Sequence, residues 1–209
     1  MHLCMHEHYE DCPWREQALY ANDSRNQALA GYYAFGEYDF PRVCFGLLGQ
    51  SFSADGYQEL CAPMKFDFTI PSFTMAWYLA VEDYVRYSGD IDYAKQNMPT
   101  IKRMIDVYNA SLENNLLPCP TGKRYWQFYD WADGLDGMNV WPQNGGLNGK
   151  RFDATLNFWY VLALRAASRI AQACCDIGSA NSFNTQAEAT TKASHAFFWD
   201  EKAAAYKTY

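Results

Sequence analysis

The sequence predicts an all-α protein built from helical hairpins. Apolar residues recur at mixed spacings of three and four over most of the 209 residues, the period of an amphipathic helix. No two alternating segments flank an Asn-Gly turn, which argues against a β-hairpin. Short turns and long aromatic segments alternate between the predicted helices. That alternation indicates hairpins whose long loops gather on one face.

The first half of the chain predicts three helices. Residues 15–34 form the first, and residues 40–52 form the second, with a proline in its first turn. Residues 53–71 are punctuated by glycine and proline and predict an irregular connection. The third helix is expected to begin at Ser72 as its N-cap and to close at Gly89.

The second half predicts three more helices. The fourth is capped by Asp90 and runs to about residue 114, with a break expected at Pro99. The fifth opens at Asp153, includes Cys174 and Cys175, and closes at Gly178. The sixth covers residues 182–198.

The segment 117–151 stands apart from this helical pattern. It holds three prolines and three tryptophans in a stretch without clear periodicity, which is long for a loop within a compact domain. Its aromatic content is too high for a solvated, disordered segment. We therefore expect a structured loop at a functional site, with Asp130 and Trp131 in it.

Composition excludes several classes of function. Apolar residues make up 49% and charged residues 20% of the chain, as in globular proteins. The net charge of −7 argues against binding to nucleic acid or an anionic membrane, because both need concentrated positive charge. No run approaches the ~20 apolar residues of a membrane span. Aromatic residues reach 17%, and sugar sites use such rings to cover the apolar face of a pyranose.

The seven cysteines predict reduced, mostly buried thiols. The count is odd and no pair has C-x-x-C spacing, which disfavours zinc and thioredoxin-like sites. Reduced thiols and an N-terminus without an apolar signal segment lead us to expect a cytoplasmic protein.

Two clusters resemble metal sites in composition, and neither has the spacing that such a site needs. The N-terminal histidines lack the H-E-x-x-H pattern, and the acidic run at 130–137 lacks the spacing and terminal Glu of a calcium loop. We expect no metal and no cofactor.

The densest cluster of polar functional groups lies at residues 11–23. If a helix starts at the proline of this segment, Glu16, Tyr20 and Asp23 share one helix face, and Asp11 and Arg15 approach it from the helix start. Carboxylates accept hydrogen bonds from hydroxyl groups and Arg donates them, so this cluster suits a polyol. Acids in a first helical turn are also favoured by the helix dipole alone.

This cluster carries a resemblance to a known family. The stretch HEHYEDCPWREQALYANDSR resembles the motif of bacterial α-L-rhamnosidase catalytic domains, which fold as six-hairpin (α/α)6 barrels. The agreement extends along the chain, with AWYLAVEDYVRYSGD, the Asp130–Trp131 pair and the FWDE at 198–201 in the family's order. The resemblance implies an all-α partial (α/α)6 barrel with about six of its twelve helices present.

The resemblance also implies roles for individual residues. Glu16 aligns with the general acid that protonates the departing glycosidic oxygen. The remaining aligned residues would bind the sugar: Asp11, Arg15, Tyr20, Asp23 and Asp130, with Trp131 as an aromatic wall and either Phe73 or Trp77 as a further aromatic, of which we select Trp77.

The family inverts anomeric configuration, which needs a second carboxylate that activates water. In the family that base comes from a later hairpin, beyond residue 209. We therefore expect residues 1–209 to be the N-terminal part of a single catalytic domain that carries the acid but not the base and is inactive alone. Its expected partners are the rest of its own barrel and a rhamnose-containing glycoside or polysaccharide. Two alternatives stay open: a helical-barrel hydrolase of another sugar, such as a glucuronide, and a non-catalytic carbohydrate-binding protein.

Overall fold

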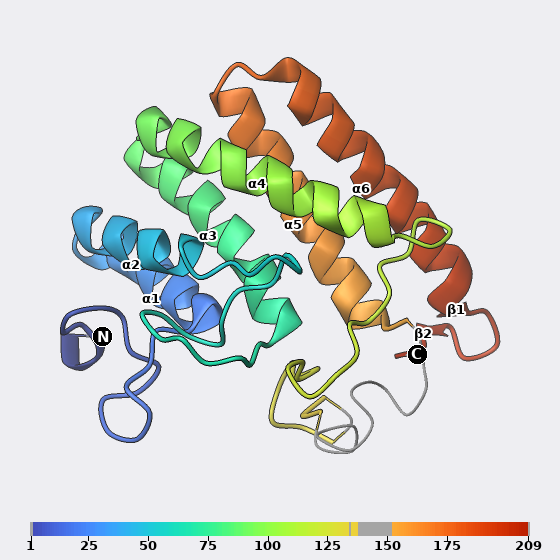
Figure 1. Cartoon of the computed structure of the whole chain (residues 1–209), viewed down its shortest axis with the longest axis horizontal. Coiled ribbons are helices and arrows are strands. Elements are labelled where there is room, and N and C mark those ends of the chain that lie inside the picture. The colour runs from blue at the N-terminus through green and yellow to red at the C-terminus, as the bar shows by residue number, and fades with distance from the viewer. Residues whose placement is uncertain (1, 134, 138–151, 209) are drawn as a thin grey trace.

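The computed structural model describes residues 2–133, 135–137 and 152–208, and six α-helices dominate them (Figure 1). A short 3-10 helix, η1, covers His2–Cys4. The helices are α1 (Ala21–Ala34), α2 (Asp39–Gly49), α3 (Pro71–Ser88), α4 (Ile91–Ser111), α5 (Ala154–Ala173) and α6 (Ile177–Phe198), followed by the strands β1 (Trp199–Asp200) and β2 (Ala205–Tyr206). The predicted all-α class with six helices is confirmed.

The helices form three successive hairpins. Short turns join α1 to α2, α3 to α4 and α5 to α6, whereas long segments join one hairpin to the next. The described parts of these long segments lie together along the lower side of the view in Figure 1, as expected from the alternation of loop lengths. Helix α3 packs against α1 on one side and α5 on the other, so it forms the centre of the described structure.

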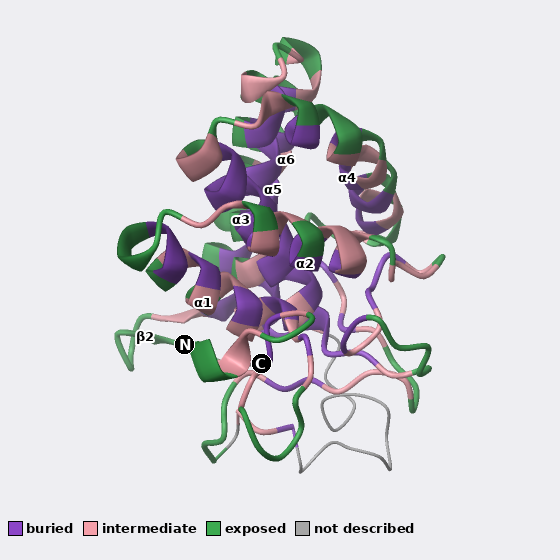
Figure 2. Cartoon of the chain, turned by 90° about the vertical axis from the view of Figure 1, so that its left-hand side faces the viewer, coloured by how far each residue is buried: buried purple, intermediate pink, exposed green. Residues whose placement is uncertain are grey.

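Helix α3 is buried along most of its length (Figure 2), and its residues Trp77, Tyr78 and Tyr84 lie in the core. Trp77 has no exposed surface, and its Nε1 donates a hydrogen bond to the carbonyl oxygen of Phe45 at 2.9 Å. The Trp77 indole also packs edge-on against Phe52, with 5.1 Å between ring centroids. The selection of Trp77 as a sugar-binding aromatic is therefore wrong, because its ring is enclosed by the α2–α3 interface.

Several helix ends lie at the residues that the sequence predicts. The carboxylates of Asp90 and Asp153 cap α4 and α5, each accepting a hydrogen bond from the backbone N–H three residues ahead. Gly89 adopts φ 74° at the end of α3, a left-handed conformation that glycine adopts without a Cβ clash. These local signals hold because each depends only on residues within one turn.

Other helix boundaries differ from the predictions. Helix α1 begins at Ala21 rather than residue 15, since Gln17 takes φ 52° and interrupts the helical pattern. Helix α3 begins at Pro71, and the Ser72 hydroxyl donates to the Phe128 carbonyl instead of capping the helix. Helix α4 continues through Pro99, which lies on the exposed face, where water can bind the carbonyl group that loses its partner.

The end of α5 and the end of the chain also differ. Helix α5 stops at Ala173, and Cys175 takes φ 59° in the turn, so Gly178 lies in the first turn of α6 rather than at a helix end. No strand pair was predicted, yet β1 and β2 form a short antiparallel hairpin. There the exposed His195 side chain, in the last turn of α6, hydrogen-bonds the Tyr206 hydroxyl at 2.9 Å.

All seven cysteines are unpaired thiols, as predicted, but only Cys44, Cys61 and Cys119 are buried. Cys175 is exposed in the turn between α5 and α6, so the expectation of mostly buried thiols is only partly met. Over the part of the chain that the structure describes, none of the helices has the length and apolarity to cross a bilayer.

Replacing Trp77 tests its assignment to the core. Trp77→Ala is expected to lower the free energy of unfolding by about 3–5 kcal/mol, because it removes a fully buried indole and leaves a cavity. Urea unfolding measures the change as a lower midpoint at an unchanged slope. The matched control is Trp14→Ala, since Trp14 is 91% exposed and its loss should cost under about 0.5 kcal/mol. Equal stability of the two variants would contradict the assignment.

Candidate functional site

A pocket of about 280 Å³ opens among the long loops, at the N-terminal ends of α1 and α3. Six of the eight residues predicted for the site line it, and they come from the segment 11–23 and from the loop after α4. The lining consists of Asp11, Arg15, Glu16, Tyr20, Asp23, Leu60, Ile70, Phe73, Trp126, Phe128 and Trp131. The pocket thus combines carboxylates and a guanidinium with aromatic rings.

The acidic segment reaches the pocket through a turn, not through the predicted helix face. Both the backbone N–H and the side chain of Asp11 bind Ala18: the N–H donates to the Ala18 carbonyl at 3.1 Å, and Oδ1 accepts from the Ala18 N–H at 3.0 Å. Within this closed turn, the Glu16 N–H points at the Cys12 Sγ at 3.4 Å. The two hydrogen bonds between Asp11 and Ala18 close this turn. The turn, rather than the predicted helix, therefore holds Glu16 near Asp11.

The polar side chains of the pocket interact with one another. Arg15 Nη2 lies 2.6 Å from Glu16 Oε1, with the two side chains 75% and 36% exposed. The Tyr20 hydroxyl donates to the Glu16 carboxylate, and burial followed by this hydrogen bond raises the pKa of Tyr20. Glu16 therefore has a cation on one side and a neutral hydrogen-bond donor on the other.

Asp23 lies in the first turn of α1 and is half-buried in the pocket. Burial raises the pKa of its carboxyl group, and the negative charges of Asp11 and Glu16 raise it further, against a backbone hydrogen bond that lowers it. The pKa of Asp23 is therefore raised first by burial and then by the two acids that share the pocket with it.

Aromatic rings form the other wall. Phe73 packs edge-on against Tyr20 at 6.0 Å and against Phe128 at 6.3 Å between centroids. Phe128 contacts both Trp126, at 4.9 Å, and Trp131, at 4.8 Å. Of the two aromatics considered on α3, Phe73 is the one that lines the pocket, and it does so because it lies one turn nearer the helix start than Trp77.

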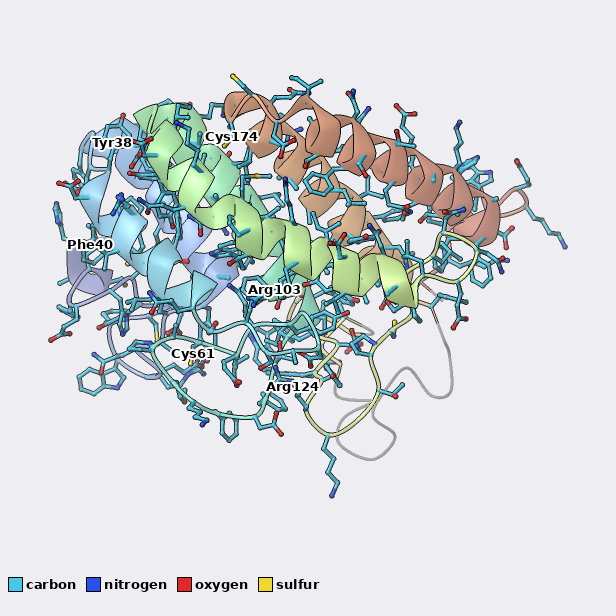
Figure 3. The ribbon with its side chains drawn as sticks, turned by 45° about the horizontal axis from the view of Figure 1, so that its top comes forward. Tyr38, Phe40, Cys61, Arg103, Arg124 and Cys174 are labelled. Carbon is cyan, nitrogen blue, oxygen red and sulfur yellow. The ribbon has the colours of Figure 1, made fainter. Side chains whose placement is uncertain are left out.

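The loop after α4 is held against the segment 53–69 by Arg124, which Figure 3 shows among the loops beneath α4. The Arg124 guanidinium binds Asp55 at 3.0 Å and Asp67 at 2.7 Å, and its side chain is only 13% exposed. The backbone adds a parallel bridge in which Thr69 accepts from Trp126 at 2.9 Å and donates to the Arg124 carbonyl at 2.8 Å. This junction fixes the position of Trp126 and Phe128.

Sequence reasoning missed Trp126 and Phe128 and misplaced Asp130. Asp130 is exposed and does not line the pocket, and its carboxylate accepts the backbone N–H of Trp131 at 2.7 Å. The stretch YWQFYDW holds aromatic residues at five of its seven positions, 126 and 128 among them. That density was a usable signal for an aromatic wall at the site.

Within the described ranges, His, Cys, Asp and Glu side chains form no group of three that could hold a metal ion. The N-terminal histidines bind protein groups instead: His6 Nδ1 lies 2.8 Å from Glu10 Oε1, and His8 Nδ1 lies 2.9 Å from the Tyr9 carbonyl. The run at 130–137 includes residue 134, which lies outside the described residues.

Comparison with solved structures places this fold among rhamnosidases. A GH78 family rhamnosidase of Bacillus sp. GL1 superposes with a TM-score of 0.82 at 27% identity, over 99% of this chain and 20% of that chain. A rhamnosidase from Klebsiella oxytoca with rhamnose bound gives 0.78 at 20% identity, over 99% of this chain and 38% of that one. An α-L-rhamnosidase from Dictyoglomus thermophilum gives 0.70 at 14% identity, over 94% and 21%.

The chain thus spans between about a fifth and two fifths of the length of these solved relatives. No curated protein matches it. The family model for the bacterial α-L-rhamnosidase six-hairpin glycosidase domain matches residues 1–209. That match covers the whole sequence, and the six helices agree with part of such an (α/α)6 barrel. The chain therefore belongs to the bacterial α-L-rhamnosidase six-hairpin glycosidase domain family.

Proposed function

We propose that this chain contributes the acid-bearing part of an inverting glycoside hydrolase that releases terminal α-L-rhamnose. The observation that carries the proposal is the pocket itself, in which Asp11, Arg15, Glu16 and Asp23 face an aromatic wall. A pyranose presents hydroxyl groups at its rim and C–H groups on its faces. Carboxylates and guanidinium can bind the first, and aromatic rings can cover the second.

Glu16 is the proposed general acid. Its carboxyl group is reached from the pocket and from solvent, as a group that must pass a proton to a departing oxygen needs to be. The Tyr20 hydroxyl supports the carboxylate left after proton transfer, because it donates a hydrogen bond to it. Arg15 supports the same charge at 2.6 Å.

Asp11 and Asp23 are proposed to bind sugar hydroxyls. One carboxylate oxygen of Asp11 accepts a hydrogen bond from the Ala18 N–H, which fixes the orientation of the carboxylate. The second oxygen is then left for a ligand. Asp23 lies in the pocket beside Asp11 and Glu16, and its carboxyl oxygens extend the set of hydroxyl groups that the pocket can bind.

The base and the remaining barrel are proposed to lie in other hairpins of the same protein. Inversion needs a second carboxyl group roughly 6.5–9.5 Å from the acid, so that a water molecule fits between the base and the sugar. The acids that line the pocket all come from residues 11–23, the cluster proposed to bind the sugar and to protonate the departing oxygen. We propose that residues 1–209 form the N-terminal part of one catalytic domain, with the water-activating carboxylate supplied from outside them.

Replacing Glu16 tests the acid assignment. In the protein that carries this chain, Glu16→Gln is expected to lower the kcat for rhamnosides with poor leaving groups by about 10²- to 10⁴-fold. Hydrolysis of p-nitrophenyl α-L-rhamnoside should fall less, because nitrophenolate leaves without protonation. Rhamnose affinity, measured by calorimetry, should stay nearly unchanged. The control is Glu201→Gln at an exposed turn, and full activity of Glu16→Gln on natural rhamnosides would overturn the assignment.

The pKa of Asp23 predicts how stability depends on pH. A carboxyl group whose pKa is raised on folding binds its proton more tightly in the native state. Stability is therefore highest below the unfolded pKa of about 3.9 and falls as pH rises through the higher native pKa. Asp23→Asn removes this loss, so the variant is expected to be more stable than the unsubstituted protein at pH 7 and equally stable at pH 3.

Urea unfolding at the two pH values checks this expectation. The matched control is Asp92→Asn, since Asp92 is also a first-turn acid, on α4, but its side chain is 85% exposed. A gain of stability at pH 7 in the Asp92 variant, or none in the Asp23 variant, would show that burial of the Asp23 charge is not the cause.

A further inference from the structure

The backbone that leads into the acidic turn is fixed to both helices of the first hairpin. The Tyr9 N–H donates to the Cys44 Sγ of α2 at 3.3 Å, and Tyr9 is fully buried. The carbonyl oxygen of the next residue, Glu10, accepts a hydrogen bond from Gln27 Nε2 of α1 at 2.6 Å. Figure 1 shows this N-terminal segment, in blue, beside α1 and α2. The residue that follows these two anchors is Asp11 of the pocket.

The Glu10 side chain places a carboxylate in the interior beside a histidine. It is only 6% exposed, and its Oε1 lies 2.8 Å from His6 Nδ1. Glu10 Oε2 is also buried and has no hydrogen-bond partner among the described residues. The Glu10 N–H donates to the Cys4 carbonyl at 2.9 Å, which brings the loop that carries His6 back onto Glu10. A carboxylate removed from water needs a compensating partner, so the charge on His6 decides how well this position is tolerated.

His6 can change that charge near neutral pH, where an imidazole titrates. The hydrogen bond to Glu10 and then the charge of Glu10 raise the pKa of His6, burial opposes the rise, and Glu7 adds to it. A raised pKa stabilises the folded segment below the unfolded value of about 6.5, and this stabilisation is lost as pH rises through the folded pKa. The other histidine beside Glu10's segment, His8, binds the backbone carbonyl of the next residue instead of a carboxylate.

The helices packed against this segment contribute groups of a different kind. Gln27 of α1 is a neutral amide. Burial raises the pKa of the Cys44 thiol of α2 to about 11, so this group is neutral at pH 7. Burial also raises the pKa of the Tyr9 phenol, and Cys44 and Glu37, which lies between α1 and α2, raise it further. The positive charge next to the Glu10 carboxylate is therefore supplied by His6 and not by these helices.

We propose that the His6–Glu10 pair is a pH-sensitive anchor that positions Asp11 in the pocket. Asp11 follows Glu10 directly, and its Oδ1 accepts the Ala18 N–H at 3.0 Å to close the turn that carries Glu16. When His6 loses its proton, the buried carboxylate loses its compensating charge, so the segment opens more often and Asp11 is held less firmly. His6 and Glu10 are positioning residues, since neither lines the pocket. The proposal rests on the proposed function, because its effect is on a sugar bound in the pocket.

Substitutions that fix the charge at position 6 test the anchor. His6→Gln keeps a hydrogen-bond donor without charge, and His6→Lys stays positive because a lysine has a pKa of about 10.4. Calorimetry measures rhamnose binding by the protein that carries this chain, at pH 5.5 and pH 8.5. At pH 5.5 the unsubstituted protein should match His6→Lys and bind about 3- to 10-fold more tightly than His6→Gln. At pH 8.5 it should match His6→Gln, with His6→Lys tighter by the same factor.

Two comparisons isolate the pair from other effects of pH. Variants are compared at one pH, so the titration of the pocket acids cancels. In a protein that already carries Glu10→Gln, His6→Gln should change the affinity at neither pH, because no buried carboxylate remains. His2→Gln is the matched control: His2 lies in the same segment, but its ring contacts Phe35 at 4.5 Å between centroids. This variant should behave as the unsubstituted protein does.

Hydrogen exchange of the amides of residues 9–18 gives a second readout that needs no sugar. At each pH, exchange should be slower in His6→Lys than in His6→Gln. Equal exchange in the two variants would overturn the anchor. A difference in exchange with equal rhamnose affinity would also overturn it, because Asp11 would then not depend on the pair. Exchange that follows the charge at position 6 in a protein that binds no rhamnose would contradict the proposed function and support the anchor alone.

Discussion

The site depends above all on one partly buried cation, Arg124. Arg124 joins two loops that are far apart in the sequence. Its guanidinium donates hydrogen bonds to two carboxylates and a hydroxyl group within residues 53–67. Burial opposes its charge, but the surrounding carboxylates outweigh that cost and raise the Arg124 pKa, so the ion pair stays intact over the physiological pH range. A planar fork of five donors suits this position better than an ammonium group. Without it, the aromatic wall would be held to the rest of the pocket by the Thr69 backbone bridge and the Ser72 hydroxyl.

The pocket shows how loops can position chemistry as firmly as helices. The acidic turn is closed by paired hydrogen bonds between Asp11 and Ala18. Asn157 on α5, with no exposed surface, holds the start of the loop after α4 through the backbone N–H and carbonyl of Leu117, at 2.8 Å and 3.0 Å. Each anchor satisfies buried backbone groups that would otherwise be costly to leave unpaired. The helical hairpins serve as the scaffold, and their long loops form the site at one end.

Function and stability oppose each other at the acidic cluster. Asp11, Glu16 and Asp23 line one small pocket, and the raised pKa of Asp23 reports the cost of placing that charge there. A backbone hydrogen bond at Asp23 offsets only part of it. Such a concentration of like charges is typical of a site that binds a polar ligand, because a packed core would not retain it. The fully buried Trp77, by contrast, belongs to the part of the chain that stabilises the fold.

The sequence by itself determined the helical class, the caps at Asp90 and Asp153, and the motif that groups the pocket acids. Each of these depends on residues close together in the chain, where periodicity and capping act. Tertiary structure alone decided that Glu16 lies in a turn rather than on a helix, that Phe73 rather than Trp77 faces the pocket, and that Trp126 and Phe128 complete the wall. The aromatic wall rests on contacts across about 50 residues or more, such as Ser72 with Phe128 and Arg124 with Asp55. The turn at Glu16 rests instead on the contact of Asp11 with Ala18. Local pattern carries no information about which distant loop will be anchored against which.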